Sequence, residues 1–337
     1  VDSGQAFQAS LRNPFPDGIE APVGAAEQVT TFLGQGITYL APNRVNPYVQ
    51  RWSFNLQREM PARVLIDLGY IGSRGVKLST TQDLNAVPAQ YLSTSPVRDS
   101  GVINLLTQTV SNPFFGMAEF GRSSIQGQTL ARSQLLRPYP QFSSLSTVTG
   151  AGSSWYHALA LRVEKRLSQG FSLQGSYTYS KTMEAVEYLN PSDMAPTHSI
   201  STLDRTHGLS ITGIYDLTVG LRRRWLNHSR LLDLAVGGWS VQGIYQGSSG
   251  LPLSFGNAAF YGNIKDIALP NSERTADRWF NTEAGFEKSA GRQLANNIRT
   301  FPLRLSGVRS DGFNILNLSA YKNFRITERF RLQFRAE

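Results

Sequence analysis

The 337-residue chain contains no cysteine, only four histidines and no apolar run long enough for a membrane-spanning helix. The absence of cysteine excludes disulfides, thiolate catalysis and cysteine-based zinc sites. A transmembrane helix needs about 20 consecutive apolar residues, so helical membrane spans are excluded too. The chain shows no signal peptide or initiator methionine, and its last alternating segment continues to Glu337. We therefore expect it to be a segment of a longer protein.

Motifs for catalysis are also missing, since the sequence has no GxSxG, HExxH or P-loop pattern. His198 and His207 flank Asp204, but this spacing fits no standard metal motif, and loop histidines are more often simply solvated. We accordingly expect no metal, no cofactor and no enzymatic activity.

The formal net charge is +9, which is compatible with nucleic acid or an anionic membrane as a partner. Lysine and arginine are scattered along the chain, and the densest cluster, Arg222-Arg223-Arg224, has no nucleic-acid-binding motif around it. We therefore assign the positive charge to loops and to the water-facing side of the strands described below, and we expect no nucleic acid partner.

The stretch from Trp155 to Thr182 has the clearest periodicity in the chain. Two runs of alternating residues are joined by Ser168-Gln169-Gly170, which is the pattern of a β-hairpin. Each run is long enough for a tilted transmembrane strand, which takes roughly 9–11 residues. The face that is mainly apolar contains His157, Leu159, Leu161, Val163, Leu167, Phe171, Leu173, Tyr177 and Tyr179.

This alternation alone does not distinguish a membrane strand from a half-buried strand of a soluble sheet. Two details favour the membrane. The opposite face is long and mixed in polarity, as a wet lumen permits, and the apolar face ends in Tyr177 and Tyr179. Tyrosine at a strand end suits the headgroup region, where its ring is apolar and its hydroxyl stays hydrated.

The same alternation recurs along the chain, which predicts eight strands and an all-β fold. The expected class is an antiparallel up-and-down transmembrane β-barrel portion, a curved sheet with long external loops. We divide the chain into a loop-rich lead-in (1–50) and a barrel portion (51–337). The expected strands lie near 51–60, 63–72, 155–167, 171–181, 206–217, 239–249, 312–324 and 329–337. Long connections are expected over 73–154, 183–205 and 250–311, with a short helical excursion within 218–238. The residues expected to face outward include Leu161, Leu173, Leu209, Val241 and Leu332.

Several phrases, in order, resemble a known family. They are NPYVQRWSFNLQREMPARVLIDLGYIGSRGVKL (46–78), NPFFG (112–116), LLRPYPQFSSL (135–145), WYHALALRVEKRLSQGFSLQGSYTYSKTME (155–184), GGWSVQGIYQGSSGLPL (237–253), DRWFN (277–281) and NLSAYKNFRITERFRLQFRAE (317–337). From about residue 40 onward the chain is similar to the C-terminal part of the barrel of Oar-like TonB-dependent receptors of the acidobacterial type.

The resemblance implies a 22-stranded outer-membrane barrel with an N-terminal plug, often preceded by a carboxypeptidase-regulatory-like β-sandwich. Such receptors import, or in some members export, bulky substrates with energy passed through TonB. No TonB box, plug or β-sandwich is recognisable within residues 1–337. The TonB complex would therefore be contacted through a missing N-terminal region.

Two sets of residues are candidates for binding. Polar-face residues could contact cargo or a plug; they are Arg162, Glu164, Arg166, Gln174, Arg331, Gln333 and Arg335. Loop aromatics could stack on a sugar or another amphipathic ligand, although packing within the loops is the commoner role. They are Trp155, Tyr156, Tyr188 and Trp279, together with Tyr48 and Tyr261.

The function predicted on this basis is TonB-dependent transport of an unidentified bulky ligand, a saccharide being one candidate, across the outer membrane of a Gram-negative-type bacterium. The expected partners are outer-membrane lipid, the TonB complex and the unknown ligand. The alternative is an adhesin-like barrel that binds at the cell surface without transport. A barrel enzyme ranks third because the sequence singles out no catalytic set.

Overall fold

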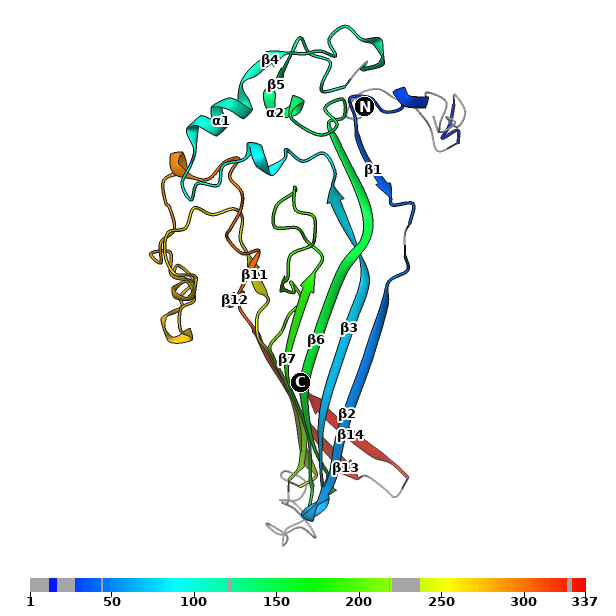
Figure 1. The fold of residues 1–337 in the computed structure, drawn as a ribbon. Coiled ribbons are helices and arrows are strands. Elements are labelled where there is room, and N and C mark those ends of the chain that lie inside the picture. Colours follow the sequence, from blue (N-terminus) through cyan, green and yellow to red (C-terminus); the bar gives the residue numbers. More distant parts are fainter. Residues whose placement is uncertain are drawn as a thin grey trace.

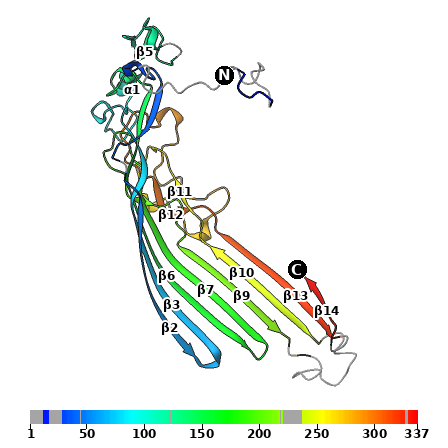
Figure 2. The ribbon, with the colours of Figure 1, turned by 90° about the vertical axis from the view of Figure 1, so that its right-hand side faces the viewer.

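A computed structural model describes residues 12–16, 28–43, 45–120, 123–217, 219, 237–325 and 329–337. Its main feature is a ten-stranded sheet in which the strands pair in the order β14-β13-β10-β9-β7-β6-β3-β2. Figure 2 shows these strands side by side in one curved, open layer. The strands of this path are β2 (Tyr48–Met60), β3 (Val64–Asp83), β6 (Ser144–Ser168), β7 (Phe171–Ala185), β9 (His207–Asp216), β10 (Trp239–Ser248), β13 (Phe313–Arg325) and β14 (Arg331–Ala336).

The remaining elements are short and belong mostly to the long connections. β1 (Gly36–Leu40) pairs with β6 in parallel, and β8 (Ser199–Ile200) pairs with β7. The small pairs are β4 (Thr109–Ser111) with β5 (Thr129–Ala131), and β11 (Pro252–Ser254) with β12 (Arg304–Arg309). The helices are α1 (Ser100–Thr107), α2 (Arg132–Leu135) and 3₁₀ turns at Gln28–Thr30, Pro61–Arg63, Ala89–Tyr91, Ala118–Phe120, Ile264–Asp266, Asn271–Glu273 and Ala290–Arg292. None of the helices in the described ranges has the length and apolar character to cross a membrane.

Tight turns join strands at one end of the sheet, and long connections gather at the other (Figure 1). The turn between β6 and β7 consists of Gln169 and Gly170, both with positive φ (54° and 79°), closed by the Ser168–Phe171 pair. Two central residues with positive φ form the turn that matches the natural twist of a hairpin. This end corresponds to the short-turn side expected of an outer-membrane barrel.

The strand register places the apolar alternation of every strand on one face of the sheet. One row of in-register residues, running across five strands, is Leu56, Leu68, Leu161, Tyr177 and Leu209. The neighbouring row on the opposite face is Gln57, Asp67, Arg162, Ser176 and Ser210. The residues expected to face outward are exposed, or half-buried in the case of Leu173, and none lies in a closed core. The expected all-β, up-and-down sheet with an apolar and a polar face is thus confirmed.

Two strands run much further than the sequence indicates, so the expected 73–154 loop was wrong at both ends. β3 continues to Asp83, and β6 begins at Ser144. These extensions are rich in serine, threonine and glycine, and their pairing shifts register at Val76/Leu78 and Leu78/Thr80. Each bulge reverses the side-chain alternation, so a period-two pattern cannot be followed through it.

The first fifty residues also contain strand structure that the sequence does not indicate. β1 lies within them, and β2 begins at Tyr48. β1 is held by parallel pairing with Ser144–Val148, the part of β6 that the sequence analysis assigned to a loop. The helical excursion expected within 218–238 lies largely outside the described residues.

Among the described residues, the apolar cores lie in the long connections and not on the main sheet. One core centres on the buried residues Ile267, Phe301, Leu305 and Val308. A second contains the buried residues Phe120, Ile125 and Leu130. The long connections are therefore folded, and together we call them the loop cap. Its first, middle and third segments are residues 84–143, 186–206 and 249–312.

Candidate functional site

The polar face of the sheet brings together three of the predicted site residues. Arg162 Nη2 lies 3.0 Å from Glu164 Oε2, and Glu164 is in register with Gln174 on the adjacent strand. Asp67 of β3 is the in-register neighbour of Arg162 on its other side. Acid, base and amide groups thus alternate across β3, β6 and β7, which gives this wall hydrogen-bonding capacity toward a hydrated lumen. Arg166 is exposed near the end of β6.

The other three polar-face candidates lie at the far edge of the sheet. Arg335 forms an ion pair with Glu337, and its guanidinium lies 5.2 Å from the ring centre of Tyr321. Gln333 Nε2 donates to Asn323 Oδ1 at 3.0 Å, and Arg331 is in register with Arg325. Since β9, β10 and β13 separate β14 from β7, the seven residues form two groups and not one site.

Polar side chains connect the segments of the loop cap by donating hydrogen bonds to backbone carbonyl oxygens of other segments. Asn297 Nδ2 donates to the carbonyl oxygens of Ser95 (2.9 Å) and Val97 (3.0 Å). Arg98 Nη1 donates to the carbonyl oxygen of Gln293 at 2.8 Å. These contacts connect residues about 200 positions apart in the chain, so the first and third segments form one unit.

The middle segment is fastened to the third by an exchange between Asn190 and Arg299. The Asn190 side chain accepts from the Arg299 amide (2.7 Å) and donates to its carbonyl oxygen (3.2 Å). The Arg299 guanidinium donates to the Phe255 carbonyl oxygen at 2.6 Å. Burial lowers the pKa of Arg299, the charge of Glu187 raises it, and that of Arg304 lowers it further. The group nevertheless keeps its proton at neutral pH because an arginine titrates far above it.

Two ion-pair clusters connect the third segment to β7 and to the middle segment. Arg304 is buried, and its Nη1 and Nη2 lie 2.7 Å from Glu187 and 3.2 Å from Glu184. Arg309 Nη2 lies 2.6 Å from Asp204 Oδ2, and Asp204 is fully buried. Asp204 Oδ1 also accepts from the Thr182 amide at 2.5 Å. Charges buried at this depth remain stable only with such partners.

The interior of the third segment is a cluster of phenylalanines. The ring centres of Phe255, Phe260, Phe286 and Phe301 lie 4.9 to 6.2 Å apart in the contacting pairs. Most of these contacts are edge-on or tilted, the geometry that aromatic quadrupoles favour. These contacts form the apolar core of the third segment of the loop cap.

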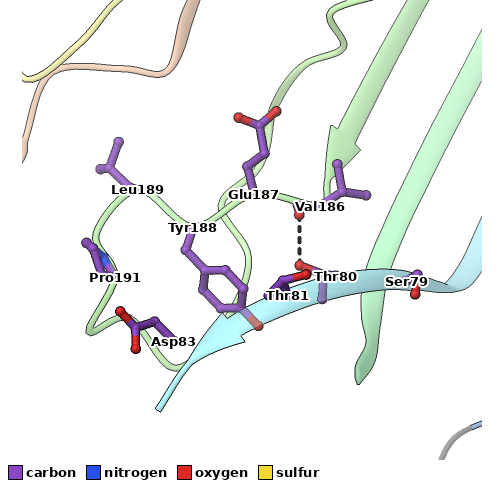
Figure 3. A pocket seen from close by; sticks show the side chains of 9 residues that line it. All are labelled: Ser79, Thr80, Thr81, Asp83, Val186, Glu187, Tyr188, Leu189 and Pro191. Atoms are coloured by element: carbon purple, nitrogen blue, oxygen red, sulfur yellow. Dashed lines mark hydrogen bonds between the residues drawn. The ribbon is translucent and has the colours of Figure 1, made fainter. Parts of the chain in front are cut away.

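A cavity of about 710 Å³ lies at the rim, between the end of β3 and the middle segment. Figure 3 shows the Tyr188 ring directed toward β3 and the Glu187 carboxylate pointing away from it. Thr80 Oγ1 donates to the Val186 carbonyl oxygen at 2.8 Å, which joins the two walls. The lining residues are Ser79, Thr80, Thr81, Asp83, Val186, Glu187, Tyr188, Leu189 and Pro191. An aromatic ring beside hydroxyls and the Asp83 carboxylate is suited to a polar, hydroxyl-rich ligand.

A second cavity, of about 690 Å³, lies where the third segment meets β9 and β13. Trp279 lines it, and its Nε1 donates to the Arg309 carbonyl oxygen at 2.5 Å. The indole is therefore held in place by the same residue that pairs with Asp204.

Three of the candidates described as loop aromatics lie in strands, and for Trp155 and Tyr156 this agrees with the strand expected over 155–167. Trp155 and Tyr156 are within β6, and Tyr48 is the first residue of β2. Trp155 lies on the apolar face, where its ring contacts His198 (4.9 Å between centres). Trp155 and Tyr156 both lie well inside the strand, because β6 begins eleven residues before Trp155. Tyr188 and Trp279 do lie in the cap, each at a cavity.

In the part of the chain that the structure describes, no group of three or more histidine, aspartate or glutamate side chains is placed to hold a metal ion. Asp204, which stands between His198 and His207 in the sequence, is partnered by Arg309 instead. The cap-fastening residues Asn190, Asn297, Arg304 and Arg309 were missed by the sequence analysis. The partners that join them to other segments are 100 or more positions away, and no local pattern indicates such pairs.

A family model described as "Outer membrane beta barrel domain" matches residues 1–337. No curated protein matches the chain. Solved structures with a similar arrangement include the outer membrane transporter YddB from Escherichia coli (7% identity, TM-score 0.39, 88% of this chain and 29% of that one). Another is the pyoverdine outer membrane receptor FpvA from Pseudomonas aeruginosa PAO1 (11% identity, TM-score 0.38, 85% and 24%). The chain spans less than a third of the length of either protein.

Proposed function

We propose that this chain, which belongs to the outer membrane beta barrel domain family, is part of a TonB-dependent receptor. It forms part of the barrel and of the external cap of a receptor of the Oar-like, acidobacterial type. The protein is located in the outer membrane, surrounded by its lipid. The ordered resemblance of the phrases at 46–78, 155–184 and 317–337 supports the assignment to this subfamily.

The observation that carries the proposal is the folded loop cap at one end of a wall with a polar face. Spanning the membrane does not require long connections that are held together by buried ion pairs. A receptor has to present a defined external surface to its ligand, and rigid support improves such binding. The cavity at Tyr188 opens in this cap.

The ligand class we propose is a bulky, hydroxyl-rich molecule such as an oligosaccharide. Tyr188 offers a ring for stacking, and Ser79, Thr81 and Asp83 offer hydrogen-bonding groups beside it. The polar-face residues remain proposed contacts for cargo or for a plug; they are Arg162, Glu164, Arg166, Gln174, Arg331, Gln333 and Arg335. Tyr156, Tyr188 and Trp279 remain proposed contacts for the ligand, whereas Trp155 lies on the lipid-facing side of the sheet and is withdrawn from this set. No catalytic role is proposed for any of them.

An uptake assay separates transport from surface binding. Cells that produce the protein are incubated with fluorescent maltodextrin, xylan and chitin oligosaccharides, with and without a functional TonB. Transport predicts that one probe accumulates in a wash-resistant form only in cells with TonB, and that Tyr188→Ala reduces this accumulation. The adhesin-like alternative predicts equal, washable binding in both strains.

A further inference from the structure

The apolar face of the sheet carries a belt of amphipathic side chains toward its loop end. The Tyr70 hydroxyl and His157 Nδ1 lie 2.7 Å apart, and the Tyr177 hydroxyl and His207 Nδ1 lie 2.8 Å apart. Trp52 packs beside His157, with 6.4 Å between ring centres. Rings with one wet polar atom collect at the headgroup level of a membrane. This belt therefore marks where the outer leaflet ends on the barrel wall.

Three exposed basic residues occupy the same face at and beyond the belt, and we call Arg74, Lys77 and Lys181 the basic patch. The Arg74 guanidinium lies 5.9 Å from the Trp155 ring centre, and Lys77 Nζ lies 5.6 Å from that of Tyr48. Lys181 is in register with His157 across the β6–β7 pair. Ring contacts of this kind orient a cation while leaving its charge available.

The basic patch has no acidic neighbour among the in-register residues that surround it on this face. Four successive rows across β2, β3, β6, β7 and the strands beside β7 make up this region. The rows are Tyr48, Val76, Ser153 and Ala185; Gln50, Arg74, Trp155, Met183 and Ile200; Trp52, Gly72, His157 and Lys181; and Phe54, Tyr70, Leu159, Tyr179 and His207. Glu184 follows Met183 in β7 but belongs to the opposite face, where Arg304 and Ser201 bind its carboxylate. The positive charge on the lipid-facing side is thus uncompensated within these rows.

We propose that the basic patch binds the phosphate groups of an anionic lipid headgroup in the outer leaflet. The patch adjoins the level at which headgroups lie, and its charge is complementary to phosphate. Arginine can bind a phosphate through two parallel hydrogen bonds, and the two lysines add point charges on either side. Attraction of basic side chains to an anionic lipid surface corresponds to about a fivefold change in affinity per charge.

The test uses the full-length protein purified in detergent and native mass spectrometry of retained diphosphoryl lipid A. Removing three charges in R74Q/K77Q/K181Q should weaken retention on the order of a hundredfold. The control K265Q/R278Q/R292Q removes the same charge from exposed residues of the loop cap and should retain lipid like the wild type. The charge-conserving variant R74K/K77R/K181R should keep most of the binding, and heat-modifiable gel mobility checks that every variant is folded.

Two further arms identify the ligand chemistry. Monophosphoryl lipid A should bind more weakly than the diphosphoryl form, and inorganic phosphate at the same concentration should not displace the lipid. Equal retention by both charge-removing variants would overturn the proposal. So would equal binding of the two lipid forms, or displacement by inorganic phosphate alone. All of these results are independent of transport, because none of them requires TonB or a transported ligand.

Discussion

Arg309 and Asp204 lie 105 residues apart in sequence, and their Nη2 and Oδ2 atoms are 2.6 Å apart. Because Asp204 is fully buried, removing Arg309 leaves its carboxylate without an ion-pair partner. Breaking a buried pair in this way costs about 3–5 kcal/mol. We expect Arg309→Met to increase hydrogen exchange of the β11–β12 pair and of residues 200–206, while the membrane-spanning strands keep their protection.

The exposed pair of Lys288 and Glu283 is the matched control for this prediction. Exposed ion pairs contribute little to stability because water screens them, so Lys288→Met should change exchange little. Equal effects of the two substitutions would show that the Arg309–Asp204 pair does not anchor the cap.

The phenylalanine core predicts that the loop cap can unfold while the sheet stays intact. Phe301 is buried and contacts Phe255, Phe260 and Phe286. Phe301→Ala should destabilise the cap by about 3–5 kcal/mol, because it removes a large buried side chain and leaves a cavity. Limited proteolysis of intact cells should then cut within 249–312, whereas heat-modifiable mobility of the barrel persists. Phe115→Ala, at an exposed position, should leave the proteolysis pattern unchanged.

Asp99 predicts a pH dependence confined to α1. The Val102 amide and the Ser93 hydroxyl donate to its carboxylate and hold its pKa below the ordinary 3.8. The charged form therefore stabilises the helix above pH 3.8, and this contribution is lost as the pH falls through the lower pKa of the folded protein. Protection of the α1 amides against hydrogen exchange should drop in that acidic range. Asp99→Asn should show no such step, and a step that persisted in this variant would have another origin.

The two faces of the β6–β7 hairpin predict unequal penalties for a buried charge in the bilayer. Leu161→Arg should destabilise the lipid-inserted protein, by about 2–4 kcal/mol at the bilayer midplane and by less toward the headgroup level. Gln174→Arg, on the polar face, should cost much less. Reversible unfolding from lipid vesicles measures both, and similar penalties would contradict the assignment of the faces.

The membrane-spanning part of the fold could be predicted because each of its strands repeats the same period-two pattern. The alternation of Leu159, Leu161 and Val163 with Ala160 and Arg162 gives both the strand and its faces. The turn at Gln169-Gly170 was predictable because a short glycine-containing segment separates the two alternating runs. Both turn residues have positive φ angles, which glycine adopts readily.

The loop cap could not be predicted, because its structure depends on contacts between distant residues. Asn297 binds the carbonyl oxygens of Ser95 and Val97, and nothing in the sequence near any of them indicates the others. The extension of β3 to Asp83 was hidden by register shifts. One local signal that could have been used is Asp99, which precedes α1 and caps it.

The central claim is that the face carrying Leu161 contacts lipid and the face carrying Arg162 contacts water. Because the chain has no cysteine, a spin label can be attached to single introduced cysteines from position 158 to position 164 of the protein in lipid vesicles. We predict that collision with oxygen is high at 159, 161 and 163, and that collision with a water-soluble nickel complex is high at 160, 162 and 164. Loss of this two-residue alternation, or its inversion, would contradict the account.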